Sequence, residues 1–368
     1  MAPLVAEDAL ERAGDWFLCS GIQEPSGGVA RYYRSDWGRN ARISTEITGY
    51  AVTFLMYVYR RTGQAKYLDS ALRAARFLTR QAWDRELLLF PFELSPELSM
   101  PGAAPTPPAY FFDSGIVARG LLAAWRVTQD DEFLDVAIST GRGMIEHFRV
   151  ANQLAPILLL PSRQPMPYEP RWSASPGCYQ LKSAMAWQDL FEITGDSAFH
   201  QAYEDALKSA LASHASFLPG DPVPERVMDR LHAYLYFLEG LLPVADRPEC
   251  RAAMQQGMVR VALYLRKIAP QFARSDVYAQ LLRVRLFCSS LGIVAMDARA
   301  AEEEASATEG FRFYTGGERF TGGFGFGLQS GREMPFVNPV STAFCGQALD
   351  MWRQCRAGGL TLDRHLLV

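Results

Sequence analysis

The stretch ISTEITGYAVTFLMYVYRRTGQAKYLDSALRAARFL, residues 43–78, decides the fold. Its first part is a helix that is apolar on nearly all faces, and such a helix is buried on all faces. A short Thr-Gly turn follows. In the second part, apolar residues recur at the i, i+3, i+4 and i+7 spacing of a helix with one buried stripe. The stretch therefore predicts a hairpin of one inner and one outer helix.

The same hairpin recurs along the chain. Turns at Thr62, Thr128 and Thr194 are equally spaced, and each precedes a helix with one apolar stripe, while a looser copy starts near Ala245. Inner helices, apolar nearly all round, are expected at 45–60, 113–127, 178–193, 230–242, 276–290 and 339–355. Outer helices are expected to begin near Ala6, Lys66, Asp131, Ser197, Pro248 and Gly292.

Six inner helices closing inside six outer ones make an all-α (α/α)6 toroid, which we expect to form a single domain over residues 1–368. An open α-solenoid shares the hairpins but does not need inner helices that are buried all round. Small residues such as Gly49, Gly115 and Gly120 would let the inner helices approach one another closely. Strand signals are confined to loops, chiefly at 86–93 and 311–327.

Composition narrows the class of protein. The chain of 368 residues is 49% apolar and 21% charged, with a net charge of −3 and scattered basic residues, so nucleic acid is not an expected partner. Six cysteines without a C-x-x-C pair fit reduced thiols in a cytoplasmic protein. The N-terminal segment lacks the pattern of a signal peptide, and no run is long and apolar enough to span a bilayer. No metal site and no cofactor are expected, because His, Cys, Asp and Glu do not cluster at ligand spacing and no glycine loop follows a strand.

Long loops precede several inner helices, whereas the loops at the opposite end are short. The long loops are rich in aromatic residues, Arg and Gly, as a binding surface requires. The alternative is that they only plug the mouth of the central funnel. Flat aromatic rings beside hydrogen-bonding groups suit sugars, and the candidates for stacking are Tyr33, Trp37, Phe92, Tyr168, Trp172, Phe324 and Phe326.

Polar residues open the inner helices and would face this mouth. They include Glu46, Asp113, Gln180, Lys182, Arg230, His232, Gln280 and Asn338. Each also has a structural reading. Asn338 before Pro339 is better explained as a helix cap, Asp113 caps a helix or carries chemistry, and a lone His232 is usually a satisfied core residue.

Glu46 and Asp113 open neighbouring inner helices, so their carboxyl groups are expected to converge on one ligand. Paired carboxylates in different environments perform glycosidic bond chemistry, one as proton donor and one as base or stabiliser. A helix N-terminus lowers a carboxyl pKa, so the acid must be the more desolvated of the two.

Five phrases carry a resemblance to a known family: TEITGYAV, FFDSGIVARGLLAAW, SAMAWQDLFEITGD, HAYLYFLEGLL and NPVSTAFCGQALDMW. Together they resemble helical-toroid proteins encoded among bacterial exopolysaccharide biosynthesis genes, which are distantly similar to six-hairpin glycosidases. Some members of that wider group are unsaturated glucuronyl hydrolases with two acidic residues on successive inner helices. Glu46 and Asp113 match that arrangement loosely, with Glu where those hydrolases have Asp. Related sugar 2-epimerases use two histidines, and here only His232 is suitably placed.

The leading hypothesis is a carbohydrate-active hydrolase or lyase acting on an oligosaccharide or a uronic-acid-containing glycoside. Glu46 and Asp113 would be catalytic. The substrate-binding residues would be Tyr33, Trp37, Trp172, Gln180, Lys182, Arg230, His232, Gln280 and Asn338. The alternatives are a sugar epimerase or isomerase and a non-catalytic glycan-binding protein of polysaccharide assembly.

Overall fold

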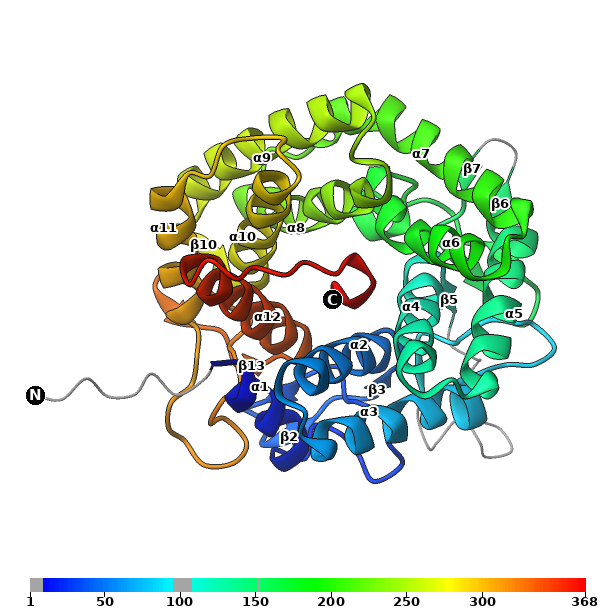
Figure 1. Cartoon of the computed structure of the whole chain (residues 1–368), viewed down its shortest axis with the longest axis horizontal. Coiled ribbons are helices and arrows are strands. Elements are labelled where there is room, and N and C mark those ends of the chain that lie inside the picture. The colour runs from blue at the N-terminus through cyan, green and yellow to red at the C-terminus, as the bar shows by residue number, and fades with distance from the viewer. Residues whose placement is uncertain (1–8, 95–107, 151–152) are drawn as a thin grey trace, which may run out of the picture.

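A computed structural model describes residues 9–94, 108–150 and 153–368 of the chain. Within these ranges twelve α-helices form a closed double ring, seen down its axis in Figure 1. The inner helices are α2 (Thr45–Thr62), α4 (Phe111–Thr128), α6 (Leu181–Thr194), α8 (Pro224–Gly240), α10 (Ser275–Ser290) and α12 (Pro339–Arg356). The outer helices are α1 (Ala9–Cys19), α3 (Ala65–Phe77), α5 (Asp131–Phe148), α7 (Ser197–Phe217), α9 (Pro248–Ile268) and α11 (Ala298–Glu309). The predicted (α/α)6 toroid is confirmed; Ala6, expected near the start of the first outer helix, lies outside the described residues.

The recurring threonines end the inner helices in the same way. The hydroxyl groups of Thr62, Thr128 and Thr194 each donate to the carbonyl four residues earlier. Each hydroxyl oxygen also accepts from the backbone N–H two residues later. Asp130 and Asp196 then cap α5 and α7 by accepting from the N–H two residues further on. The repeat in the sequence is thus a repeated helix stop and start.

Glycines bring the inner helices into close contact, as the sequence predicted. A Cβ atom on Gly120 of α4 would lie 2.6 Å from the carbonyl oxygen of Gly49 in α2. A Cβ atom on Gly115 would lie 2.4 Å from the carbonyl oxygen of Ser183 in α6. Such distances leave no room for a larger residue, so these glycines set the spacing of the inner ring.

Two helices, α8 and α11, begin six residues away from their predicted starts. The inner helix α8 begins at Pro224 rather than Arg230, because proline at the first helical position has a φ angle already suited to the helix. The outer helix α11 begins at Ala298 rather than Gly292, where Asp297 accepts from the backbone N–H of Ala300. The longer α8 moves Arg230 from the helix opening to its second turn.

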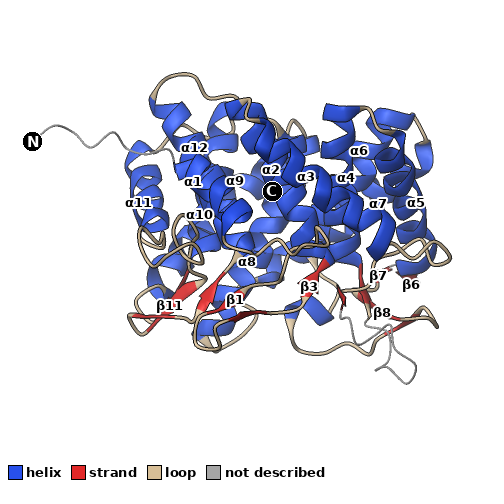
Figure 2. Ribbon diagram, turned by 90° about the horizontal axis from the view of Figure 1, so that it is seen from below, coloured by secondary structure: helices blue, strands red, loops and turns tan. Residues whose placement is uncertain are grey.

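Short strands gather at one end of the ring, as Figure 2 shows. They are β1 (Tyr33–Arg34), β2 (Arg39–Asn40), β3 (Ile43–Ser44), β4 (Glu93–Leu94), β5 (Ala109–Tyr110), β6 (Arg149–Val150), β7 (Gln153–Leu154), β8 (Ile157–Leu159), β9 (Gln164–Pro165), β10 (Phe272–Arg274), β11 (Gly327–Gln329), β12 (Arg332–Glu333) and β13 (Phe336–Val337). They pair antiparallel as β13-β1-β2, β10-β11-β12, β3-β4, β5-β8-β9 and β6-β7. Most lie outside the predicted stretches 86–93 and 311–327, whose interiors make isolated bridges instead. Because β3, β5, β10 and β13 each lead into an inner helix, these pairs fix the entrances of α2, α4, α10 and α12.

Two sequence expectations concern the chain as a whole. All six cysteines are free, as the reduced-thiol prediction requires, and four of them are buried. Among the helices of the described ranges, none combines the length and apolar character needed to cross a bilayer.

Candidate functional site

A cavity of about 480 Å³ opens at the end of the ring where the strands gather. Its lining includes Glu46, Asp113 and Asp276 from the first turns of α2, α4 and α10. His232 of α8 and Asn338, which precedes α12, also line it. Several inner helices therefore direct polar residues to one space.

Glu46 and Asp113 carry the most unusual electrostatics in this cavity. Glu46 is half-buried, and burial raises its pKa to about 7 although Arg31 opposes the shift. Asp113 is 3% exposed; burial, followed by the charge of Glu46, raises its pKa well above the usual range. The helix N-termini favour both anions by only about 0.3–1 kcal/mol each, so desolvation dominates. The two groups therefore compete for ionisation.

Neither carboxyl group is neutralised by a cation at contact distance. Oδ2 of Asp113 is buried and has no hydrogen-bond partner among the described residues. Within the same residues no ion pair reaches Glu46; Arg31, whose charge opposes the rise in its pKa, pairs with Glu93 at 3.1 Å. Nor does Asp113 cap its helix, since the N-cap position of α4 is Tyr110. An unsatisfied buried carboxyl group costs about 1–3 kcal/mol, which a purely structural role does not explain.

Asp276 differs from the other two acids because its charge is matched. Arg274 contacts both of its carboxylate oxygens, at 3.0 and 2.6 Å, and also reaches Asp229 at 2.6 Å. Burial works to raise the pKa of Asp276, but the charge and hydrogen bonds of Arg274 outweigh it and the pKa is lowered overall. Asp276 is therefore held as an anion by Arg274, whereas burial raises the pKa of both Glu46 and Asp113.

His232 is held in one orientation by Gln280. Nδ1 of His232 lies 2.7 Å from Oε1 of Gln280 and 3.6 Å from the carboxylate of Asp276. Burial lowers the pKa of His232 to about 4, so its ring is neutral at pH 7. Since an amide oxygen only accepts, Nδ1 carries the proton and Nε2 keeps a free lone pair. His232 can accept a hydrogen bond or a proton.

The walls of the cavity are aromatic, with two exposed arginines among the lining residues. The aromatic lining includes Phe92, Tyr110, Phe112, Trp172, Tyr179 and Tyr236. Arg31 and Arg171 are the exposed arginines, and Arg31 stacks 5.0 Å over the ring of Phe92. Flat rings next to charged hydrogen-bond donors suit a ligand with apolar faces and polar edges.

Five residues of the sequence-based site lie in this cavity: Glu46, Asp113, Trp172, His232 and Asn338. Asn338 also caps α12, as its preferred reading required, because its Oδ1 accepts from the N–H groups of Val340 and Ser341 at 2.8 and 3.3 Å. Gln280 is not part of the lining but supports His232 from behind.

Four of the seven aromatic stacking candidates lie away from the lining, namely Tyr33, Trp37, Tyr168 and Phe324, whereas Phe92, Trp172 and Phe326 are part of it. Tyr33 is buried in β1 and packs against Phe320, whereas its neighbour Tyr32 lines the cavity. Successive strand residues point to opposite faces, which accounts for the exchange. Trp37 is 56% exposed, and the guanidinium group of Arg34 lies 3.7 Å over its ring.

Three polar residues expected at the mouth have other partners. Gln180 accepts from the N–H of Gly177 and donates to the carbonyl of Leu154. Arg230 donates to the backbone carbonyl of Phe217, and its guanidinium group stacks on the Phe217 ring. Arg230 takes this position because α8 starts earlier than predicted. These side chains hold loops in place.

Lys182 is the third, and it points to the axis of the ring rather than to the cavity. It is fully buried and pairs with Glu239 at 2.8 Å. Burial, partly offset by the charge of Glu239, lowers the pKa of Lys182 to about 7. Its position at the opening of α6 did not determine its direction.

Sequence reasoning overlooked several lining residues. Arg31 and Tyr32 belong to the long loop before α2, Arg171 adjoins Trp172, and Arg274 ends β10. The aromatic and basic composition of these loops was the available signal. What it lacked was the strand pairing that decides which side chain of each loop faces inward.

One cluster outside the cavity has metal-ligand chemistry, although no metal site was expected. Ligand atoms of Asp189, Glu192 and His365 all lie within 4.8 Å of one another. Asp189 is, however, already paired with Arg119 at 3.0 Å, and Glu192 is paired with Arg364. Because both negative charges are matched by guanidinium groups, the cluster fits an ion-pair network better than a cation site.

No protein-family model matches this chain, and no curated protein sequence matches it significantly. Solved structures do. A sugar epimerase from a ruminal bacterium superposes with a TM-score of 0.70 at 11% identity, covering 93% of this chain and 98% of the other. The likeness is one of fold. Cellobiose 2-epimerase from Spirochaeta thermophila superposes with a TM-score of 0.65 at 15% identity, covering 95% of this chain and 99% of the other. An unsaturated glucuronyl hydrolase from a Bacillus species superposes with a TM-score of 0.66 at 13% identity, covering 96% of this chain and 97% of the other. The chain thus has the six-hairpin fold found among carbohydrate-active enzymes.

Proposed function

We propose that the protein is a carbohydrate-active enzyme that cleaves a glycosidic bond, with Glu46 and Asp113 as its acid/base pair. The observation that carries the proposal is the pair itself. The two carboxyl groups line one aromatic-walled cavity, have raised pKa values and lack contacting cations. A pair of carboxyl groups that differ in protonation is the apparatus of glycosidic bond cleavage.

The two environments assign the roles. Asp113 is the more buried group and feels the charge of Glu46, so it holds the shared proton at neutral pH and acts as the general acid. The charge of Arg31 opposes the effect of burial on the pKa of Glu46 and favours its anion. Glu46 is therefore the base or the stabilising carboxylate.

The remaining lining groups suit a saccharide with a negative charge. Trp172, which is half-buried, provides a flat surface for the C–H face of a sugar ring, while Asn338 and His232 line the same space and can meet hydroxyl groups. A uronic acid would place its carboxylate near Arg31 and Arg171, the exposed cations of the lining. An acidic oligosaccharide of polysaccharide metabolism is therefore our proposed substrate class.

A panel of oligosaccharides with and without terminal uronic acids tests the proposal. The purified protein is incubated with each member and the products are identified by mass spectrometry. We expect cleavage of uronic-acid-containing members, loss of that cleavage in Asp113→Asn, and no loss in Asp131→Asn, an acid in the first turn of the outer helix α5. Saccharide binding without cleavage, unaffected by neutralising Glu46 and Asp113, would instead support a glycan-binding protein.

Epimerisation or isomerisation of a sugar is the second candidate, and one observation favours it. His232 has a neutral ring in the same cavity and a free lone pair on Nε2, as a base that removes a sugar C–H proton needs. Against it, His232 is the only histidine among the lining residues of this cavity. Deuterium incorporation from solvent into a sugar C–H bond, without cleavage, would identify this chemistry.

A further inference from the structure

The segment that follows α12 turns back into the ring. Residues 357–368 run from the end of α12 to the axis, where the described chain finishes inside the circle of inner helices (Figure 1). Its last three residues, Leu366, Leu367 and Val368, are 5%, 2% and 0% exposed. The segment meets residues of the C-terminal halves of the inner helices, such as Arg60 and Gln354, and so lies at the end opposite the cavity.

Inner helices bind the backbone of this segment through buried side chains. Arg119 of α4 donates to the carbonyl oxygens of Arg364 and Leu367, the latter at 3.2 Å. Gln347 of α12 donates to the carbonyl oxygen of Leu366 at 2.7 Å. Both side chains are nearly inaccessible, at 3% and 1% exposed. Backbone recognition of this kind is typical of a peptide-binding groove.

The same binding mode extends to the last residue. Lys182 donates to the carbonyl oxygen of Val368 at 3.2 Å, and the N–H of Val368 donates to Oε1 of Gln347 at 3.3 Å. Behind them, Glu239 pairs with both Lys182 and Arg283, at 2.8 and 2.6 Å. The two cations share one carboxylate, so Lys182 has donor capacity left, and the segment takes it up.

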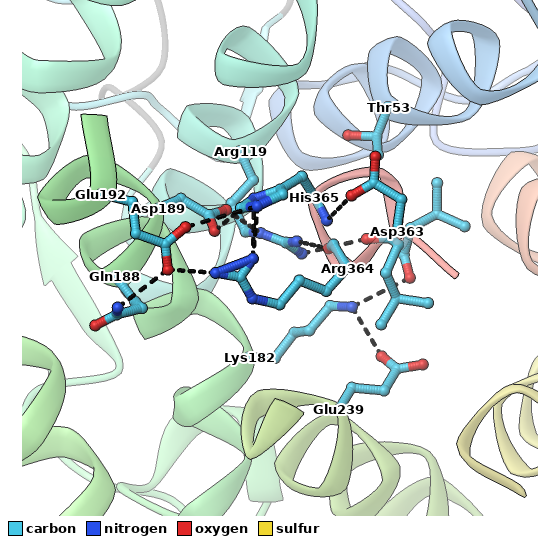
Figure 3. Close-up of polar contacts among 12 residues, drawn as sticks. Thr53, Arg119, Lys182, Gln188, Asp189, Glu192, Glu239, Asp363, Arg364 and His365 are labelled. Carbon is cyan, nitrogen blue, oxygen red and sulfur yellow. Dashed lines mark hydrogen bonds and ion pairs between the residues drawn. The ribbon is translucent and has the colours of Figure 1, made fainter. Parts of the chain in front are cut away.

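Side chains of the segment complete the contact, as Figure 3 shows. Nδ1 of His365 lies 3.1 Å from Asp189, whose other oxygen contacts Arg119. Arg364 pairs with Glu192. The cluster with metal-ligand chemistry is thereby explained as the anchor of this segment on α6.

We propose that the far end of the ring is a peptide-binding site whose occupant is the chain's own segment, residues 361–368. If the segment left this site, Arg119, Lys182 and Gln347 would lose the buried hydrogen bonds that they donate to it. Its own residues Leu366, Leu367 and Val368 would become exposed. The bound segment closes the far end and supports the buried polar side chains that lie between it and the cavity. One of these side chains, Arg283, stacks 4.2 Å over Phe344, and Phe344 packs against His232 in the cavity wall.

Truncation with peptide added back tests the proposal. A chain ending at Gly359 is expected to unfold at least about 5 °C lower, and a synthetic peptide of residues 358–368 is expected to bind it saturably and restore the Tm. A peptide with Leu366→Asp and Leu367→Asp should do neither. Arg60→Ala in the full chain removes only the exposed pair between Arg60 and Asp363, at 2.9 Å, and should leave the Tm unchanged. An unchanged Tm in the truncated chain, or no binding by the native peptide, would overturn the proposal.

Hydrogen exchange on the intact chain decides the matter if the truncated chain does not fold. The amides of Leu366, Leu367 and Val368 should exchange at rates close to those of the inner helices, because each donates a hydrogen bond within the ring. Exchange of all three amides at the rate of an unstructured peptide would contradict the proposal. Neither readout depends on enzymatic turnover, so failure here is distinct from failure of the proposed function.

Discussion

Asp113 owes its raised pKa first to burial and then to the charge of Glu46, which lies in the first turn of the neighbouring inner helix. The relationship follows from the fold, because a ring of parallel inner helices brings successive N-termini to one mouth. In the proposed function, the pair would supply one carboxylic acid and one carboxylate to the same cavity, as bond cleavage at neutral pH needs.

Neutralising either carboxyl group should abolish most turnover without disturbing the fold. Asp113→Asn and Glu46→Gln keep the shape of each side chain, and neither residue caps its helix. We expect kcat to fall by about 10²–10⁴-fold in each variant. Turnover and circular dichroism are measured on the same samples, so that a loss of catalysis can be told from a loss of the fold. Wild-type turnover in Asp113→Asn would remove that residue from the mechanism.

Stability should depend on pH through Glu46. Its pKa is about 7 in the folded protein against 4.5 for the ordinary group. A raised carboxyl pKa stabilises the folded state fully below the unfolded value, and this contribution is lost as pH rises through the folded value. Relative to Glu46→Gln, the wild-type protein should therefore lose stability between about pH 4.5 and pH 7. Urea unfolding of both proteins across this range gives the difference, and parallel curves would refute the shift.

His232 should contribute to binding rather than to the chemical step if the enzyme cleaves glycosides. Its low pKa, about 4, keeps the ring neutral. His232→Asn is expected to lower kcat/KM by about 10–100-fold, mainly through KM. The pH profile should show no inflection near pH 6.5. A collapse of kcat together with loss of solvent deuterium exchange would favour epimerisation.

Gly120 should tolerate no side chain, because its position sets the distance between α2 and α4. In Gly120→Ala the new Cβ would meet the carbonyl oxygen of Gly49 at 2.6 Å, and backbone cannot move aside as a flexible side chain does. We expect a loss of about 1–3 kcal/mol in the free energy of unfolding. Gly359→Ala is the matched control, since nothing lies within 4 Å of that site. Equal stability of the two variants would argue against the tight inner ring.

The architecture could be predicted from the sequence because each type of helix has its own periodic pattern of apolar residues. Burial all round marks an inner helix, one stripe marks an outer helix, and the threonine turns mark their junctions. The start of α8 was missed because the apolar pattern begins at Leu231, whereas the helix begins at Pro224. That difference moved Arg230 to a contact with Phe217.

Side-chain direction was the part that the sequence could not supply. Lys182 and Asp113 both lie near helix openings, yet Lys182 points to the axis of the ring because it binds Glu239 and the carbonyl oxygen of Val368 there. Tyr32 and Tyr33 differ by one strand position and so face opposite sides. The segment at 361–368 lacks helical periodicity altogether, and its burial depends on contacts with residues more than a hundred positions away, such as Arg119 and Lys182.

A carboxyl titration by carbon-13 NMR tests the central claim most directly and needs no substrate. Spectra of the wild-type protein, Glu46→Gln and Asp113→Asn across pH 3–9 assign the two resonances. We predict that Glu46 titrates near pH 7, that Asp113 titrates above its ordinary range, and that the Asp113 pKa falls in Glu46→Gln because the neighbouring charge is gone. Independent titration of both groups near pH 4, unchanged by either substitution, would contradict the account.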